Sequence, residues 1–175
     1  MGLESESGKG DKVLRIAAQD VPTVAAITNQ GQGNFAVVSY IGTDYDDLLV
    51  NEIGRYDGMV YISPGVDMLK ITSSGQWQIQ RSFIDAATQW DGTSSLGGKG
   101  DSVVVITGGS FASTTISNQS DSNFVVIAYS EFGDYLDLLV NEIGNYGGEV
   151  LLPIEDPIVL AIQDVGGSWS MSAVQ

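Results

Sequence analysis

The chain has 175 residues, of which 43% are hydrophobic, so it is long enough and apolar enough to bury one or two cores. With 22 acidic and 7 basic residues, its net charge of −15 disfavours nucleic acid and anionic membrane surfaces as partners, and no apolar run predicts membrane insertion. The absence of Cys and His excludes disulfides, thiolate or imidazole metal sites and His-dependent catalysis.

In chain order, the pattern predicts a flexible lead and then a long series of strands. Residues 1–7 have neither the basic nor the apolar part of a signal peptide. The strand segments that follow are rich in Val, Ile, Tyr and Thr and are bounded by Gly, Asn, Asp, Ser and Pro. We expect strands over residues 13–17, 23–28, 35–41, 48–53, 59–62, 68–72 and 77–80, and again over residues 103–106, 113–117, 124–130, 138–143, 150–152, 158–162 and 169–173. Residues 44–54 also fit a helix, but the Val and Asn inside them and the closing Gly favour a strand or bulge.

An internal repeat organises these segments. Four blocks recur in the same order about 90 residues later, which is the signature of a duplicated structural module. The matching blocks are Gly8–Asp11 with Gly98–Asp101, Asn34–Val38 with Asn123–Ile127, Leu48–Gly54 with Leu138–Gly144, and Gly75–Trp77 with Gly167–Trp169. We therefore predict an all-β protein of two tandem jelly-roll-like antiparallel β-sandwich modules, spanning residues 8–82 and 98–175, with a junction at 83–97.

The acidic turn before the identical block carries a family resemblance. Residues 44–50 read Asp-Tyr-Asp-Asp-Leu-Leu-Val, and residues 134–140 read Asp-Tyr-Leu-Asp-Leu-Leu-Val. An acidic turn running into Asp-Leu-x-Val resembles the pre-peptidase C-terminal domains of bacterial secreted and surface proteins. The resemblance implies a β-sandwich similar to carbohydrate-binding jelly rolls, in a secreted or cell-surface setting, and some such domains bind calcium or extracellular polymers.

Two interpretations of these acidic turns are open. Carboxylate and turn carbonyl oxygens are the ligands that Ca²⁺ prefers, and alternate residues of a strand point the same way. Acidic turns also end strands and block the pairing of sheet edges. The candidate metal ligands are Asp44, Asp46 and Asp47 in the first module, and Asp134 and Asp137 in the second.

Candidate ligand-contacting residues lie in and just after the identical block. An Asn–Glu pair can contact a ligand or cap an adjacent turn, and a Tyr before a turn can present its ring to a sugar or pack in the core. The candidates are Asn51, Glu52 and Tyr56, with Asn141, Glu142 and Tyr146 at the matching positions. Trp77 and Trp169 share one repeat position, which favours a core role for both.

These observations favour a non-catalytic binding module, since no catalytic constellation stands out. The expected partner is a glycan or a protein surface, with calcium as an optional support and no required cofactor. No Lys or Arg follows Lys99, so a cationic partner is one interpretation and a solubilising acidic surface another. The alternative function is a structural or assembly subunit that self-associates through exposed β edges, with residues 35–41 as a donor strand. A hydrolase is the third interpretation.

Overall fold

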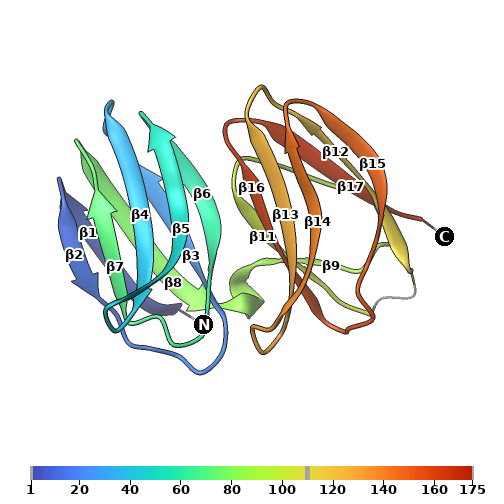
Figure 1. Cartoon of the computed structure of the whole chain (residues 1–175), viewed down its shortest axis with the longest axis horizontal. Coiled ribbons are helices and arrows are strands. Elements are labelled where there is room, and N and C mark those ends of the chain that lie inside the picture. The colour runs from blue at the N-terminus through green and yellow to red at the C-terminus, as the bar shows by residue number, and fades with distance from the viewer. Residues whose placement is uncertain (1, 109–110, 175) are drawn as a thin grey trace. The chain divides into compact units, whose positions relative to one another are not determined.

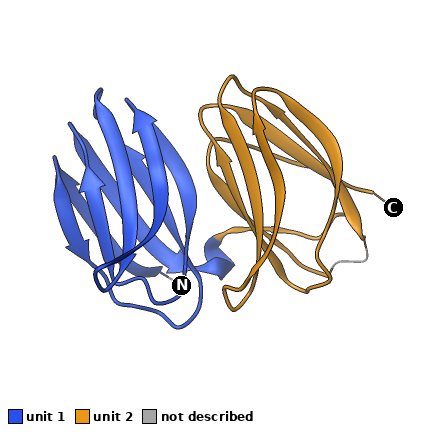
Figure 2. Ribbon diagram, viewed as in Figure 1, with its two compact units in different colours: residues 1–86 blue, residues 87–175 orange. Residues whose placement is uncertain are grey.

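The computed structural model describes residues 2–108 and 111–174, which form two compact units spanning residues 1–86 and 87–175 (Figure 2). Both units consist of β-strands, and the one helical segment among the described residues is the short 3-10 turn η1, Ile84–Ala86. In Figure 1 the strands of each unit form two layers. The predicted all-β class is confirmed.

Unit 1 contains two four-stranded antiparallel sheets. One sheet has the order β1-β8-β3-β6 and the other the order β2-β7-β4-β5. Every strand pair in them is antiparallel. The strands are β1 (Gly2–Lys9), β2 (Lys12–Arg15), β3 (Thr23–Asn29), β4 (Asn34–Ile41), β5 (Asp44–Ile53), β6 (Tyr56–Ile62), β7 (Met68–Thr72) and β8 (Gln76–Phe83).

Unit 2 repeats this topology and adds one strand. Its sheets have the orders β10-β17-β12-β15 and β14-β13-β16-β11-β9, and β9 pairs in parallel with β11 as the extra edge strand. The predicted repeat therefore extends to strand order as well as to sequence. The strands are β9 (Thr88–Trp90), β10 (Leu96–Lys99), β11 (Ser102–Ile106), β12 (Ser113–Gln119), β13 (Asn123–Ser130), β14 (Tyr135–Ile143), β15 (Tyr146–Leu151), β16 (Ile158–Asp164) and β17 (Ser168–Val174).

The ends of the predicted modules differ from the observed units. The expected flexible lead belongs to β1, which pairs with β8 from Gly2 onwards. Its Glu4 forms an ion pair with Arg81, whose guanidinium is buried and also donates to the Ala17 carbonyl at 2.9 Å. The predicted junction supplies η1 and also β9 and β10, which pair with β11 and β17 inside unit 2.

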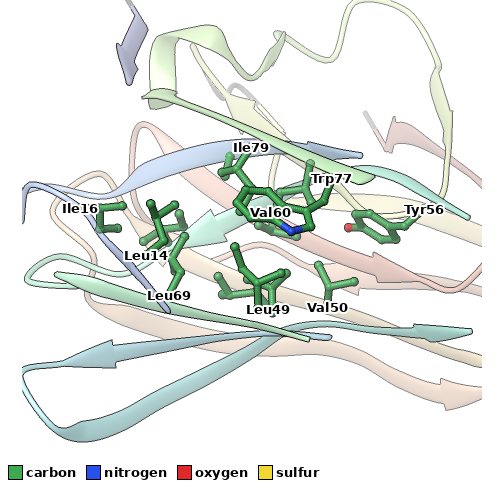
Figure 3. Close-up of a cluster of buried hydrophobic side chains, with 14 of the residues drawn as sticks. Leu14, Ile16, Leu49, Val50, Tyr56, Val60, Leu69, Trp77 and Ile79 are labelled. Atoms are coloured by element: carbon green, nitrogen blue, oxygen red, sulfur yellow. The ribbon is translucent and has the colours of Figure 1, made fainter. Parts of the chain in front are cut away.

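A separate hydrophobic core lies between the two sheets of each unit. In unit 1, Trp77 and Ile79 on β8 face Leu49 and Leu69 of the opposite sheet (Figure 3). In unit 2, Trp169 takes the position of Trp77 in the corresponding cluster. The core role expected for the two repeated tryptophans is confirmed, since both side chains are buried.

The repeated Gly-Lys-Gly motif holds each core Trp in place. The Trp77 indole N–H donates to the Gly10 carbonyl at 2.9 Å, and the Trp169 indole N–H donates to the Gly100 carbonyl at 3.1 Å. A Cβ atom at Gly8 would lie 2.9 Å from Trp77 Cε2, and the same close approach occurs between Gly98 and Trp169. Glycine is required at both positions because only a bare backbone can cover the ring.

Two β-bulges shape the hairpin of the identical block. The β4–β5 register shifts between Val37 and Val38, and again between Ser39 and Tyr40. The β13–β14 register shifts at the two matching places. A bulge inserts an unpaired residue and bends its strand. The stretch with helical character is therefore the bulged edge strand β5.

Candidate functional site

The predicted metal ligands of unit 1 form hydrogen bonds with different groups of the protein. The Asp46 carboxylate accepts a hydrogen bond from the buried Ser39 hydroxyl at 2.8 Å. The Asp47 carboxylate accepts the N–H of Leu48 at 2.8 Å. Burial raises the pKa of Asp47, the Leu48 hydrogen bond opposes that rise, and the charge of Asp46 adds to it. Asp44 is exposed at the start of β5.

The matching acids of unit 2 repeat only part of this arrangement. Asp137 caps the N–H of Leu138 at 2.8 Å as Asp47 caps Leu48, and Asp134 belongs to the hairpin turn, where its N–H donates to the Ser130 hydroxyl. Leu136 and Ala128 stand where unit 1 has Asp46 and Ser39. Across residues 2–108 and 111–174, no three acidic side chains are grouped to hold a metal ion. The acids of these turns therefore serve local hydrogen bonds, and calcium binding by them stays a prediction.

The two tyrosines predicted as sugar platforms lie against the cores instead. Tyr56 is buried, and its ring centroid is 5.7 Å from that of Phe35. Tyr146 packs on Phe124 at 6.0 Å, and its hydroxyl lies over Gly148. The Tyr56 ring therefore lies in the core of unit 1, and the Tyr146 ring is half-buried against the core of unit 2. Neither ring is a fully exposed platform, and ligand contact by these residues stays a prediction.

The predicted Asn–Glu pairs lie on edge strands. β5 and β14 each form one edge of their sheet. Asn51 and Asn141 are exposed, Glu142 is exposed, and Glu52 is half-buried. Residues 35–41, expected as a donor edge, belong to β4, which is paired on one side with β5 and on the other with β7. That strand has no open edge, so the prediction that it donates one is wrong.

The outward-facing side of the β4–β5 hairpin presents exposed side chains on β5 and mostly half-buried ones on β4. Phe35, Val37 and Ser39 of β4 are buried, so the alternate residues of this strand point away from the core. Each is opposite a residue of β5 in the register. These cross-strand pairs, here called the β4–β5 face, are Asn34 with Ile53, Ala36 with Asn51, Val38 with Leu48, and Tyr40 with Tyr45.

Unit 2 carries the same surface, here called the β13–β14 face. Its pairs are Asn123 with Ile143, Val125 with Asn141, Ile127 with Leu138, and Tyr129 with Tyr135. Six of the eight positions hold the same residue in both units, and the other two exchange one aliphatic side chain for another. The tyrosine pairs also share a geometry: the ring centroids lie 6.3 Å apart, edge to face, in both units.

Solvent exposure of these side chains is unusually high for apolar and aromatic groups. The exposed fraction is 63% for Tyr45 and 61% for Tyr135, and 82% for Ile53 and 79% for Ile143. Packing therefore does not require these residues to stay the same in both units. A repeated patch of exposed apolar and aromatic side chains is typical of a binding surface.

Several outward-facing positions elsewhere on the two units have diverged. Gln76, Gln78 and Gln80 on β8 correspond to serines at 168, 170 and 172 on β17. On β7, Lys70 lies beside Val38 in the register, and its counterpart on β16 is Ala161. Identity among exposed apolar and aromatic side chains is thus concentrated on the two faces, and the unit 1 face alone has a lysine beside it.

Sequence reasoning did not single out Tyr45 and Tyr135, although a signal for them exists. Tyr40 and Tyr45 are paired across a two-residue hairpin turn that contains Gly42, which has a φ of 63°. A Tyr on each side of a predicted tight turn places both rings on one side of the hairpin. The bulges hid this, because they change which residues of β5 face outward.

The two largest hollows described lie elsewhere on the units. One of about 510 Å³ in unit 1 is lined by Lys9, Thr28, Gln76 and Gln78 among others, and one of about 540 Å³ in unit 2 by Phe111, Leu152 and Ile154 among others. Their linings share no chemistry, so the duplicated feature is the pair of faces. No helix in the described part of the chain has the length and apolarity to cross a membrane.

Comparison with known proteins gives neither a family nor a curated relative, since no protein-family model and no curated protein matches the chain. Among solved structures, the tandem CBM51 modules of a family 98 glycoside hydrolase from Streptococcus pneumoniae share 7% identity at a TM-score of 0.31, covering 97% of this chain and 83% of that one. The M60 catalytic domain with two CBM51 domains of Clostridium perfringens ZmpB shares 5% identity at a TM-score of 0.28, covering 99% and 34%. The exported protein XepA of PBSX shares 13% identity at a TM-score of 0.29, covering 98% and 84%. Similarity at this level carries no information about a ligand.

Proposed function

We propose that this chain is a non-catalytic glycan-binding protein of the extracellular space or cell surface, and that it binds through the β4–β5 and β13–β14 faces. The observation that carries the proposal is the identity of exposed side chains on these faces, where packing imposes no such identity. The resemblance of the acidic turns to pre-peptidase C-terminal domains is consistent with this setting and stays an expectation.

The chemistry of the faces suits a sugar. A pyranose ring has an apolar C–H side that stacks on an aromatic ring, and a rim of hydroxyls that need hydrogen-bond partners. Tyr45 supplies an exposed ring, Leu48 an apolar neighbour, and Asn51 an amide with two donors and an acceptor. Tyr135, Leu138 and Asn141 supply the same groups in unit 2.

Assembly through sheet edges is less favoured by the same strands. A flat, uncharged edge is what strand addition needs. β5 carries two bulges and the carboxylates of Asp44, Asp46, Asp47 and Glu52. β14 carries two bulges at the matching positions. These features oppose the pairing of another strand. The two edge strands therefore favour binding through the faces over assembly through sheet edges.

A polysaccharide-binding assay with single and double variants tests the proposal. We predict that Tyr45→Ala and Tyr135→Ala each weaken binding about tenfold, which corresponds to about 1.4 kcal/mol, and that the double variant abolishes it. Tyr45→Phe, which keeps the ring, should retain most of the affinity. Ile154→Ala is the control, since Ile154 is fully exposed but lies outside both faces. Full binding by the double variant, or no binding of any neutral or acidic polysaccharide by the wild type, would contradict the proposal.

A further inference from the structure

A buried carboxylate without a hydrogen-bond partner lies at the turn between β16 and β17. Asp164 is the last residue of β16, and none of its surface is exposed. Neither of its carboxylate oxygens has a hydrogen bond to any described residue. Its own backbone N–H donates to Asp101 Oδ1 at 2.9 Å, so a second carboxylate lies beside it.

Asn118 on β12 adds two more unpartnered polar atoms. Its side chain is 2% exposed, and within the described chain neither the amide oxygen nor the amide nitrogen has a hydrogen-bond partner. Native proteins rarely leave such groups bare, because each unsatisfied buried polar atom costs about 1–3 kcal/mol. A ligand rich in charge would account for them.

Unit 1 shows how the same turn is satisfied when no ligand is needed. Ser73 stands at the position of Asp164, and its hydroxyl donates to Asn29 Oδ1 at 2.9 Å. The Gly75 N–H donates to the Ser73 hydroxyl at 3.1 Å, and Asn29 Nδ2 donates to the Gly54 carbonyl at 2.7 Å. Asp11 accepts the Ser73 N–H at 3.0 Å, as Asp101 accepts that of Asp164. The unit 2 turn therefore differs in two ways: Asp164 replaces Ser73, and the turn has one more residue before the core Trp.

The surroundings of Asp164 disfavour its charge unless a cation is present. Burial raises the pKa of Asp164, and the charge of Asp101 adds to the rise. The Gly167 N–H and the Ser120 side chain lie close by and oppose it, although neither makes a well-formed hydrogen bond. No Lys or Arg follows Lys99 in the sequence.

We propose that this turn of unit 2 is a Ca²⁺ site formed by the carboxylates of Asp101 and Asp164 and the amide oxygen of Asn118. Oxygen-only ligands, carboxylates with an amide, and water at the remaining positions are what Ca²⁺ prefers. A polar hollow of about 400 Å³ next to the turn, lined by Ser120, Asp121 and Asn145 among others, has room for water. The inference is independent of the proposed glycan faces.

Close packing around the carboxylate supports a site with a defined shape. A Cβ atom at Gly167 would lie 2.7 Å from Asp164 Oδ2 and 2.7 Å from the Ser120 Cβ. Any side chain at position 167 would therefore collide with the carboxylate, so glycine is required beside it. Zinc and copper prefer Cys and His ligands, and the chain contains neither residue. The oxygen ligands of this site therefore favour Ca²⁺ over these metals.

The test is calorimetric titration of the full-length wild type with CaCl₂, with thermal unfolding in CaCl₂ and in EGTA. We expect one Ca²⁺ per chain and a higher unfolding temperature in CaCl₂. Asp164→Ser, which introduces the residue that unit 1 has at this position, should lose at least about tenfold in Ca²⁺ affinity and should unfold at a higher temperature than the wild type in EGTA. Because this variant is expected to fold, loss of binding cannot be attributed to unfolding.

Asp57→Ser is the matched control, since it removes an exposed carboxylate of unit 1 outside every candidate metal ligand and should leave Ca²⁺ binding unchanged. Three results would overturn the site: no Ca²⁺ binding by the wild type, equal binding by Asp164→Ser, or loss of binding in Asp57→Ser. A wild type stabilised by acid but not by CaCl₂ would also overturn it, because a proton would then be the occupant.

Discussion

At the scale of single residues, Asp164 gives the β16–β17 turn a pH dependence that the matching Ser73 of unit 1 cannot have. Its pKa in the folded state is raised above 3.8 by burial and by Asp101. The stability that its protonated form contributes is therefore fully present below pH 3.8 and is lost as the pH rises through the folded-state pKa.

We predict that Asp164→Ser in EGTA is about 2 kcal/mol more stable than the wild type at pH 7, and that this advantage disappears near pH 4. Urea unfolding at several pH values, followed by the fluorescence of Trp90 and Trp169 in unit 2, measures it. An advantage that is independent of pH would show that Asp164 does not titrate in this range.

The same scale shows why site residues were only partly predictable. The exposed Asn51 and Asn141 follow from the repeat and the strand pattern. Asp46 does not, because a bulge turns it toward the Ser39 hydroxyl. Tyr56 ends in the core because the strand that carries it packs on Phe35. Asp164 carries no sequence signal except its difference from Ser73 in the other copy.

At the scale of elements, the close contact between the Gly-Lys-Gly segment and the core Trp predicts that a larger residue in this segment destabilises the unit. Gly98→Ala would place a methyl group 2.7 Å from Trp169 Cε2. We expect unit 2 to lose about 2 kcal/mol of unfolding free energy, because overpacking forces the ring or β10 to move. Gly97→Ala is the control, since its Cβ would lie 3.3 Å from the nearest atom. Equal stability of the two variants would mean that the ring tolerates the methyl group.

Strands with a clear hydrophobic alternation were predictable, and those without it were not. Residues 35–41 and 124–130 nearly coincide with β4 and β13. β1 has the sequence Gly-Leu-Glu-Ser-Glu-Ser-Gly-Lys, which contains no strand signal, and it forms because β8 offers a pairing edge and Arg81 needs Glu4. β9 forms through its pairing with β11. Tertiary pairing decides such segments.

At the scale of the whole molecule, the two units share one apolar and aromatic surface, while several other surface positions differ between them. Both units retain the topology, the Trp core position and the tyrosine-bearing face. The other sheet surface has changed from glutamines to serines, and the β16–β17 turn has gained a carboxylate. Two faces on one chain would raise avidity for a polymer that engages both.

The most direct test of the account is a ¹H–¹⁵N NMR titration of the full chain with the polysaccharide fragment that binds best. We predict that the amide shifts that move lie in residues 34–53 and 123–143, with the largest changes around Tyr45 and Tyr135. Shifts confined to β1, β8 and β3 or to their counterparts in unit 2 would place the ligand on the other sheet and contradict the account.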